Sequence, residues 1–341
     1  MIAFELRGTR DLSNCETPLH ARERQEPEPG PGMVLLKISA CGVCHTELDE
    51  IEGRTPPPKF PVVPGHQVVG RIAGSGPGTS LYSRGDRVGV GWFFSSCGTC
   101  IYCSSGRENL CPEYRATGRD ADGGYAEYMV VPESSAIPLP EVFGDAEAAP
   151  LLCAGAVGYR SLCLSRMHDG MRLGLTGFGA SGHLVLKMAR HSFPSSPVYV
   201  FARDPSQREF ALELGAAWAG DTTDRPPVPL DRIIDTTPAW KPVVEAMASL
   251  APGGRLVINA IRKESDDRRE LLELDYARHL WMEKEIRSVA NVCRSDISGF
   301  LEVAAAAGIR PQVTRMPLEQ ANRAILRLRA GGLTGSIVLI P

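Results

Sequence analysis

Four cysteines in one short segment constrain this chain more than any other feature of its sequence. The segment CGTCIYCSSGRENLC holds Cys97, Cys100, Cys103 and Cys111. Thiolates with two residues between them can reach the same tetrahedral zinc ion, and the seven-residue gap before Cys111 lets the chain return with a fourth ligand. Four thiolates leave no open coordination position, so we predict a structural zinc in a lobe over residues 97–111. Disulfide pairing is the alternative, and the spacing disfavours it.

Length and composition indicate a protein of two globular domains. The chain has 341 residues, of which 43% are hydrophobic and 23% charged, and its net charge is −3. This length favours two domains, and the weak acidic balance gives no support for binding to nucleic acid or to an anionic membrane. The N-terminus lacks the features of a signal peptide, and no stretch approaches the roughly 20 apolar residues of a membrane span. We therefore expect a cytoplasmic protein with neither partner.

The pattern of the sequence changes near Ala148. Before it, glycine and proline alternate with short apolar runs, which is typical of an irregular β domain. After it, buried strands alternate with helical segments, which predicts a parallel, doubly wound sheet. The expected strands are RLGLTGFG, PVYVFAR, DRIIDTT and RLVINAI, and the expected helices are SGHLVLKMARHS, SQREFALELGA and VVEAMASL.

A glycine-rich turn in the second region predicts a dinucleotide site. Gly177-Phe178-Gly179-Ala180-Ser181-Gly182 has the pattern G-x-G-x-x-G between a strand and a helix. The first glycine allows a tight turn, the second lets the backbone approach a pyrophosphate, and the third lets helix pack on strand. The helix N-terminus then offers free N–H groups to the phosphates. A packing turn is the alternative, which the surrounding strand–helix–strand unit disfavours.

The end of the following strand bears on the choice of coenzyme. NAD sites usually carry an acidic residue there, which accepts a hydrogen bond from the ribose 2′-hydroxyl. Here Ala202 takes that position and Arg203 follows it, so an acid does not repel a 2′-phosphate and an arginine can pair with it. Asp204 lies too late for the usual role. We slightly favour NADP(H) over NAD(H). In the alternative, NAD(H) binds without an acidic partner and Arg203 is a solvated surface residue.

A second set of ligands is scattered along the chain: Cys44, His66 and Cys153. A Cys, a His and a Cys from distant segments would form a catalytic zinc site with an open fourth position. Spacing alone supports this weakly, because a lone cysteine or histidine is more often packed in a core than bound to a metal.

Taken together, these motifs resemble the zinc-dependent alcohol dehydrogenases of the medium-chain dehydrogenase/reductase superfamily. The resemblance rests on CHT at Cys44, VPGHQVVGRI, GDRVGV, the four-cysteine lobe, GGYAEY, LLCAG and GFGASGH, in that order. It implies a GroES-like catalytic domain of irregular β structure over residues 1–153, a Rossmann coenzyme domain over residues 154–290, and a return to the catalytic domain over residues 291–341. It also implies two zinc ions per chain, one catalytic and one structural.

The resemblance assigns roles to individual residues near Cys44. Cys44, His66 and Cys153 become the ligands of a zinc that lowers the pKa of a bound alcohol or polarises a carbonyl group, while hydride moves to or from the nicotinamide. Thr46 matches the hydroxyl that passes the substrate proton toward the coenzyme, and His45 matches a residue near the pyrophosphate. Glu47 stands where the family usually has Asp, as a partner that orients the zinc-bound histidine.

Three positions depart from the family pattern. Asp49 stands where a histidine often completes proton transfer to solvent, and its usual pKa matches neutral pH poorly. Gln67 replaces a glutamate, which removes one negative charge beside the metal. Gly335-Ser336 replaces a Gly-Arg pair whose arginine lies near the pyrophosphate.

Two aromatic residues and four further cysteines complete the set of candidates. Trp92 and Phe93 match positions that line the substrate pocket, with ordinary core packing as the alternative. An apolar pocket suits an uncharged alcohol, aldehyde or ketone. The remaining cysteines, Cys15, Cys41, Cys163 and Cys293, are predicted to be plain buried thiols.

The leading hypothesis is therefore a zinc-dependent alcohol dehydrogenase or aldehyde reductase, and three alternatives remain. One is a quinone or enoyl reductase that lacks the catalytic zinc. Another is a retired dehydrogenase that binds NADP(H) as a sensor. The third, a zinc ribbon that binds nucleic acid, conflicts with the absence of a basic stripe. The resemblance also implies a homodimer or homotetramer whose Rossmann sheets meet edge to edge.

Overall fold

The computed structural model describes residues 1–331 and 335–341, and for Ala180 it describes the backbone only. The chain divides into two compact units, which are described separately. The first unit comprises residues 1–153, 292–305 and 310–341, and the second comprises residues 154–291 and 306–309.

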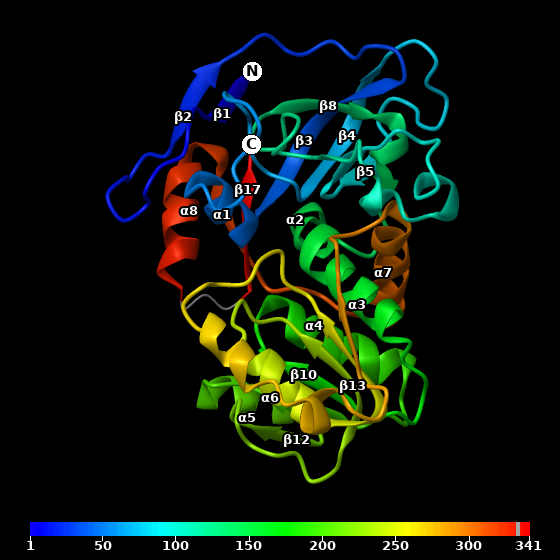
Figure 1. The fold of residues 1–341 in the computed structure, drawn as a ribbon. Coiled ribbons are helices and arrows are strands. Elements are labelled where there is room, and N and C mark those ends of the chain that lie inside the picture. Colours follow the sequence, from blue (N-terminus) through cyan, green and yellow to red (C-terminus); the bar gives the residue numbers. More distant parts are fainter. Residues whose placement is uncertain (332–334) are drawn as a thin grey trace. The chain divides into compact units, whose positions relative to one another are not determined.

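The first unit is built around a seven-stranded sheet in the order β16-β17-β3-β4-β5-β9, with β8 also paired to β3 (Figure 1). Most residues of the long central strand β3 are buried, because other strands flank it and α2 packs against it. The strands of this sheet are β3 (Met33–Val43), β4 (Val68–Ser75), β5 (Arg87–Val90), β8 (Tyr128–Pro132), β9 (Ile137–Pro138), β16 (Val313–Pro317) and β17 (Ser336–Ile340).

Shorter elements complete the first unit. Two two-stranded sheets form, one from β1 and β2 and the other from β6 and β7, and helix α8 packs against α1. These elements are β1 (Ile2–Leu6), β2 (Leu19–Glu23), β6 (Phe93–Ser95), β7 (Arg115–Ala116), α1 (His45–Ile51), α2 (Asp145–Pro150), α7 (Arg294–Ala306) and α8 (Ala321–Ala330). Short strands, turns and a mixed sheet are the irregular β structure that the glycine- and proline-rich sequence predicted.

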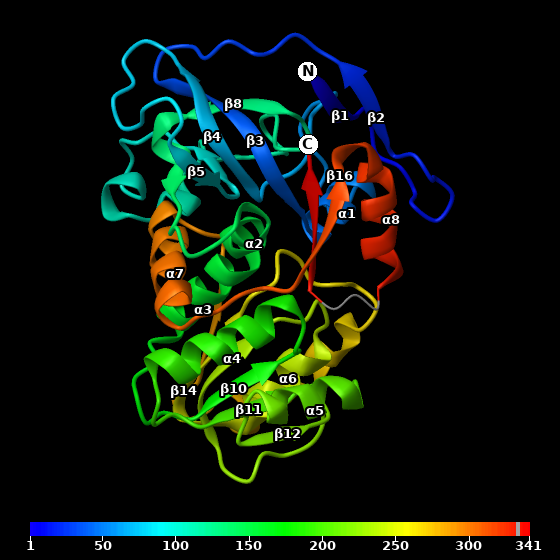
Figure 2. The ribbon, with the colours of Figure 1, turned by 180° about the vertical axis from the view of Figure 1, so that it is seen from behind.

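The second unit is a six-stranded parallel sheet in the order β12-β11-β10-β13-β14-β15 (Figures 1 and 2). The strand order reverses between β10 and β13, which is where open α/β sheets bind ligands at the carboxyl ends of their strands. Its strands are β10 (Leu173–Thr176), β11 (Val198–Phe201), β12 (Trp218–Gly220), β13 (Leu230–Asp235), β14 (Leu250–Ile258) and β15 (Glu285–Ser288). The predicted fold class, an irregular β unit with a doubly wound parallel sheet, is confirmed.

Helices cover this sheet through their apolar faces. Helix α3 packs against α4, while α6 packs over β13 and β14 in a core that includes Met247 and Leu256. The helices are α3 (Ala156–Ser165), α4 (Ala180–Ser192), α5 (Pro205–Glu213) and α6 (Lys241–Ser249). Helices α4, α5 and α6 coincide with the three segments that were predicted to be helical.

One helical stretch in the described chain, Asp145–Ser165, is long and apolar enough to span a membrane by length and composition alone. It has 21 residues because α2, a π-helical turn at Leu151–Gly155 and α3 follow one another without a break. We expected no stretch of this length. Of its most apolar window, 61% is buried within the protein, so the stretch has the burial of a core helix.

Candidate functional site

The first unit brings the three scattered ligand candidates together. The thiols of Cys44 and Cys153 and a ring nitrogen of His66 lie within 4.8 Å of one another. The His66 Nε2 atom is 3.3 Å from the Cys153 Sγ atom, and the His66 side chain is buried. Two sulfurs and an imidazole are a donor set that zinc accepts, with room for a fourth ligand. The residues therefore fit a catalytic zinc.

Each ligand is positioned by a different element. Strand β3 ends at Val43 and delivers Cys44 to the N-cap of α1. His66 follows Gly65, which has a φ of +100°. An ideal Cβ on Gly65 would lie 2.4 Å from an atom of the Tyr125 ring, so only glycine fits at this position. Cys153 lies in the π-helical turn between α2 and α3, a kind of irregularity that is frequent at functional sites.

Glu47 connects two of these ligands. Its Oε1 atom lies 2.7 Å from His66 Nδ1, and its Oε2 atom accepts a hydrogen bond of 2.8 Å from the Cys44 backbone N–H. A histidine whose Nδ1 faces a carboxylate presents Nε2 toward the metal. Burial raises the pKa of Glu47, although the neighbouring His66 opposes that rise. The predicted orienting role of Glu47 therefore has the geometry it needs.

The thiols also influence each other. A hydrogen bond from Cys153, together with the neighbouring His66, lowers the pKa of Cys44 well below its usual range despite burial. The thiolate is the form of cysteine that binds metals, so the cluster favours the ligating form of Cys44. Gln67 is buried next to His66 and contributes a hydrogen bond that opposes the rise in the pKa of Cys153.

The two aromatic residues predicted to line the substrate pocket have different neighbours. The Trp92 ring meets the His66 ring edge-on at 4.9 Å, so Trp92 forms part of the wall beside the ligands. Phe93 packs instead on Tyr114, with their ring centres 5.7 Å apart, and lies beneath the Arg294 guanidinium. The structure therefore places the Trp92 ring against a ligand residue, while the ring contacts of Phe93 are with Tyr114 and Arg294.

Helix α1 carries the candidates for proton transfer. The Thr46 hydroxyl accepts a hydrogen bond of 3.6 Å from the Cys44 thiol, so it lies at the edge of the ligand set. Asp49 is buried and forms an ion pair with Arg54, a partner that its sequence context did not predict. His45 lies exposed in the first turn of the helix.

The four-cysteine lobe forms a second cluster in the same unit. All four Sγ atoms lie within 4.8 Å of one another. Three Sγ–Sγ separations are 3.5 Å between Cys97 and Cys111, 3.6 Å between Cys100 and Cys103, and 3.9 Å between Cys97 and Cys103. Tetrahedral zinc with Zn–S bonds of about 2.3 Å separates its sulfurs by about 3.8 Å, whereas a disulfide separates them by about 2.05 Å. The geometry fits the metal and excludes disulfides between these pairs.

Backbone N–H groups support this cluster. The backbone N–H of Cys100 donates to Cys97 Sγ at 3.4 Å, and the backbone N–H of Glu113 donates to Cys111 Sγ at 3.4 Å. Hydrogen bonds from the Thr99 and Cys100 backbones lower the pKa of Cys97 to about 6. A thiolate at neutral pH is therefore favoured at this position.

The prediction that the other cysteines are buried is wrong for Cys163. Its side chain is exposed on α3, Cys15 is half-buried, and Cys41 and Cys293 are buried as predicted. Nothing in the hydrophobic run LLCAGAVGYRSLCL marked the face of α3 that carries Cys163.

In the second unit, the glycine turn joins β10 to α4 as expected. Gly177 has a φ of +77°, Gly179 is the N-cap of α4, and Ser181 lies in its first turn. An ideal Cβ on Gly182 would lie 2.6 Å from the Gly177 carbonyl oxygen, so only glycine lets the helix approach the turn. The side chain of Ala180, which belongs to the predicted motif, lies outside the described part of the structure.

Strand β11 ends at Phe201, which places Ala202 and Arg203 immediately after it. Ala202 is buried and Arg203 is exposed. The Asp204 side chain caps helix α5 by accepting from the Ser206 backbone N–H at 2.9 Å. Asp204 therefore has a capping role, and Arg203 remains the charged residue next to the strand end.

Sequence reasoning missed a polar network beside this turn. It centres on Asp235, at the end of β13, and on Lys263, which forms a buried ion pair with it. The only signal in the sequence was an acidic residue at the end of the predicted strand DRIIDTT.

Comparisons with known proteins agree with this geometry. The model of the alcohol dehydrogenase GroES-like domain matches residues 30–141. A probable alcohol dehydrogenase, AdhA, of Mycobacterium tuberculosis is 43% identical over 328 residues, which cover 95% of this chain and 93% of the relative.

Two solved structures share the fold over nearly their whole length. A cinnamyl alcohol dehydrogenase of Sorghum bicolor, SbCAD4, has a TM-score of 0.83 and 28% identity, covering 99% of this chain and 97% of that one. A zinc-binding dehydrogenase of Sinorhizobium meliloti 1021 bound to NADP has a TM-score of 0.85 and 25% identity, covering 100% and 99%. With two groups of side chains that could hold a metal ion and a glycine turn between β10 and α4, this chain belongs to the zinc-dependent alcohol dehydrogenase family of the medium-chain dehydrogenase/reductase superfamily.

Proposed function

We propose that this alcohol dehydrogenase interconverts an uncharged alcohol and its aldehyde or ketone at a zinc ion held by Cys44, His66 and Cys153, with NADP(H) as the hydride carrier. The observation that carries the proposal is the convergence of these three ligand atoms within 4.8 Å. The second cluster, at Cys97, Cys100, Cys103 and Cys111, would hold a structural zinc, which makes two zinc ions per chain.

The bound groups would supply Lewis acidity from zinc, which acidifies a hydroxyl or polarises a carbonyl, and hydride transfer from the nicotinamide. The chain's own residues orient the zinc ligands and carry the proton of the alcohol. Glu47 fixes the ring of His66 through Nδ1, 2.7 Å away, so Nε2 keeps its direction. Thr46, next to the Cys44 thiol, is placed to receive the proton that an alcohol releases.

The continuation of the proton path is the least regular part of the site. Asp49 replaces the usual histidine and is paired with Arg54. We propose that the Asp49 carboxylate, held in place by the Arg54 guanidinium, passes the proton toward solvent. Gln67, which contributes a hydrogen bond to Cys153, would present a neutral amide to a bound metal where the family has a carboxylate. Trp92 supplies the apolar wall next to His66, which supports an uncharged substrate.

The proposed preference for NADP(H) rests on the end of β11. Ala202 offers no carboxylate to repel a 2′-phosphate, and the exposed Arg203 follows it. Arginine pairs with phosphate through charge-assisted hydrogen bonds. The Sinorhizobium meliloti structure, which is similar over the whole chain, was solved with NADP, and this also supports the proposal.

The test is an assay of the zinc-loaded protein with a panel of aliphatic and aromatic alcohols and aldehydes, using NADP(H) and NAD(H) in parallel. We expect turnover with both coenzymes and a larger kcat/KM with NADP(H). In the Arg203→Ala variant, the ratio of the two kcat/KM values should fall about tenfold or more, since a charged hydrogen bond contributes about 1.5–3 kcal/mol. The matched control is Arg225→Ala, which removes an exposed arginine paired with Glu245 in the same unit.

The outcomes separate the parts of the proposal. Activity that is equal with both coenzymes, or unchanged in the Arg203→Ala variant, would reject the NADP(H) preference and leave the dehydrogenase intact. Coenzyme binding without turnover of any alcohol or carbonyl compound would instead support the retired sensor.

We further propose that the chain is a homodimer or a homotetramer whose Rossmann sheets meet at β15. This strand is the last in the sheet of the described chain, and all of its residues are exposed. Large apolar side chains are exposed on it and just before it: Leu272, Tyr276, Trp281, Met282 and Ile286. A free strand edge with exposed apolar residues favours pairing with a second copy.

Sedimentation velocity tests this assembly. The protein should sediment with the mass of two or four chains, and Ile286→Lys should shift the population toward a single chain, because the change places a charge in the paired edge. Leu81→Lys is the control, since Leu81 is an exposed apolar residue of the other unit. A wild-type protein that sediments as one chain at micromolar concentration would contradict the proposal.

We also propose a cytoplasmic location. The lobe thiols are separated by more than a disulfide bond length in the pairs given above, and one of them has a pKa lowered to about 6. Reactive thiol clusters of this kind persist as metal ligands where the compartment is reducing.

A further inference from the structure

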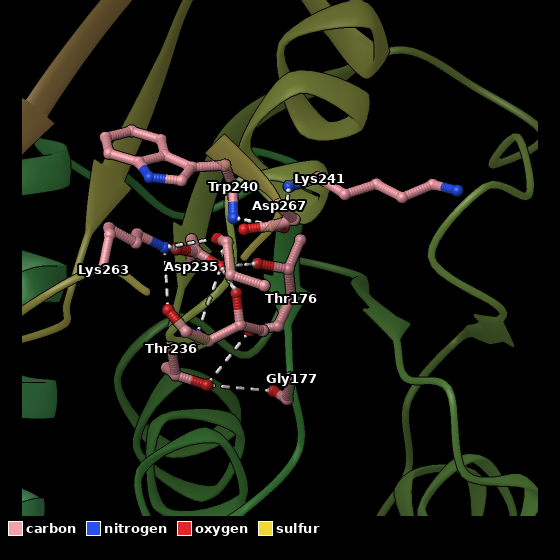
Figure 3. Close-up of polar contacts among 10 residues, drawn as sticks. Thr176, Gly177, Asp235, Thr236, Trp240, Lys241, Lys263 and Asp267 are labelled. Atoms are coloured by element: carbon pink, nitrogen blue, oxygen red, sulfur yellow. Dashed lines mark hydrogen bonds and ion pairs between the residues drawn. The ribbon is translucent and has the colours of Figure 1, made fainter. Parts of the chain in front are cut away.

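A buried ion pair lies at the carboxyl edge of the parallel sheet, where β10 and β13 end. Lys263 Nζ contacts Asp235 Oδ2, and the two side chains are 9% and 0% exposed. Figure 3 shows the ammonium group pointing at the Asp235 carboxylate, with Thr176 on the other side of that carboxylate. No ligand or catalytic role described above uses this pair.

Lys263 has no donor left for a ligand. Besides Asp235, its ammonium group donates to the Thr237 carbonyl at 2.7 Å and to the Ala239 carbonyl at 2.9 Å. An ammonium group has three N–H donors, and all three are directed at the protein. Lys263 therefore does not act as a phosphate-binding residue, and its effect must pass through the segment that it holds.

That segment is the loop 236–240, which follows β13. Lys263 binds two of its carbonyls, and Asp235 Oδ1 accepts from the Thr237 hydroxyl at 2.8 Å. The far end of the loop is fixed by Asp267, whose carboxylate accepts from the Trp240 and Lys241 backbone N–H groups at 2.7 and 2.9 Å (Figure 3). The loop is thus held at both ends by side chains of the next connection in the chain.

The same loop lies directly against the first glycine of the glycine-rich turn. The Thr236 hydroxyl donates to the Thr176 carbonyl at 3.0 Å and to the Gly177 carbonyl at 3.3 Å. An ideal Cβ on Gly177 would lie 2.8 Å from the Thr236 hydroxyl and 2.9 Å from the Thr237 methyl carbon. Any displacement of Thr236 or Thr237 therefore changes the packing against the backbone of Gly177.

We propose that the Lys263–Asp235 pair is a positioning device for the coenzyme: it holds the loop 236–240 beneath Gly177 and thereby keeps the glycine-rich turn in its binding conformation. The inference rests on the proposed function to the extent that a nicotinamide dinucleotide binds at this turn. Asp235 joins the ends of β10 and β13 by accepting a hydrogen bond of 2.5 Å from the Thr176 hydroxyl, while Lys263 fixes the loop that follows β13. Neither residue need touch the coenzyme.

Single substitutions in this pair confound positioning with folding. Lys263→Met alone would leave the buried Asp235 carboxylate without its counter-charge, which is strongly unfavourable. The double variant Lys263→Met/Asp235→Asn removes both charges, while the asparagine oxygen can still accept from Thr176 and Thr237. It therefore releases the Thr237 and Ala239 carbonyls without leaving a buried charge.

The experiment measures the Kd of NADPH and of NADH by fluorescence titration, the Tm without coenzyme, and kcat with saturating coenzyme. In the double variant we expect the Kd of each coenzyme to rise about tenfold. This is the increase expected if the glycine-rich turn has its binding conformation in only about a tenth of the molecules. We expect kcat at saturating coenzyme to change less than twofold, because the metal ligands lie in the other unit. A purely structural pair would lower Tm without this change in Kd.

The chain offers a matched control on the same two strands. Arg172 donates to Asp231 at 2.9 and 2.8 Å, and so joins the start of β13 to the residue preceding β10, at the opposite ends of these strands. Arg172→Met/Asp231→Asn should leave both Kd values unchanged even if it lowers Tm. Equal Kd values for the wild type and the Lys263/Asp235 double variant, with the wild type binding coenzyme, would overturn the inference. A wild type that binds neither coenzyme would instead refute the proposed function.

Discussion

Replacing Cys153 by alanine is expected to reduce the kcat/KM for alcohol oxidation by about a thousandfold or more. A metal acting as a Lewis acid contributes several kcal/mol to the transition state, and each 1.36 kcal/mol is a factor of ten in rate. Cys153 Sγ lies 3.3 Å from His66 Nε2, so its removal takes one of the protein's three ligands from the cluster. The protein should still contain the zinc of the four-cysteine lobe, because that cluster does not include Cys153.

The measurements are steady-state kinetics and the zinc content of the purified protein. Cys163→Ala is the matched control, since Cys163 lies in the same helical stretch but is exposed on α3. This control should keep both zinc ions and full activity. An active Cys153→Ala protein with the zinc content of the wild type would show that the cluster of Cys44, His66 and Cys153 is not the catalytic metal site.

The effect of Cys153 also illustrates what sequence patterns can and cannot predict. The lobe was predictable from spacing alone, because its four ligands lie close together along the chain and any compact loop brings them near one another. Cys44, His66 and Cys153 are separated by tens of residues, so their meeting depends on how β3, the Gly65 turn and the π-helical turn pack. Only the resemblance to a family supplied that information before the structure did.

The second unit was predictable for a different reason. Buried parallel strands are continuous apolar runs, and the helices between them show their periodicity, so RLGLTGFG and PVYVFAR were recognised as strands β10 and β11. Strand β15 was missed, because EIRS has no apolar run and none of its residues is buried. Its place in the sheet comes from backbone pairing with β14, which leaves no mark on the pattern of hydrophobic residues.

Partners of charged residues were the least predictable features. Asp49 was identified by its position after Cys44, but its ion pair with Arg54 depends on the backbone beyond the end of α1. Asp235 and Lys263 are separated along the chain by the whole of α6 and β14, and neither stands in a motif. A lysine within a polar loop is ordinarily exposed, and only the convergence of Asp235, Thr237 and Ala239 on its ammonium group explains its burial.

Replacing Cys111 by serine is expected to remove one zinc ion per chain and to lower the Tm, while the catalytic ligands remain in place. Cys111 Sγ lies 3.5 Å from Cys97 Sγ, and it is the ligand that returns the chain after the two 3₁₀ turns at Cys103–Ser105 and Glu108–Leu110. The large apolar side chains of Ile101 and Leu110 are exposed, so they do not form an apolar core for the lobe. In such a segment the free energy of metal binding is also free energy of folding.

Zinc analysis, thermal unfolding and limited proteolysis of the variant test this role. We expect cleavage within residues 97–111 in Cys111→Ser under conditions that leave the wild type intact, together with a steeper loss of activity on warming. Cys15→Ser is the control, because Cys15 is a half-buried thiol outside both metal clusters of the described chain. A Cys111→Ser protein that keeps two zinc ions and the wild-type Tm would contradict a structural zinc. Four thiolates around one zinc leave no position for a substrate, so a structural site takes no direct part in the reaction. Loss of all activity at low temperature with an unchanged Tm would therefore also contradict a structural zinc.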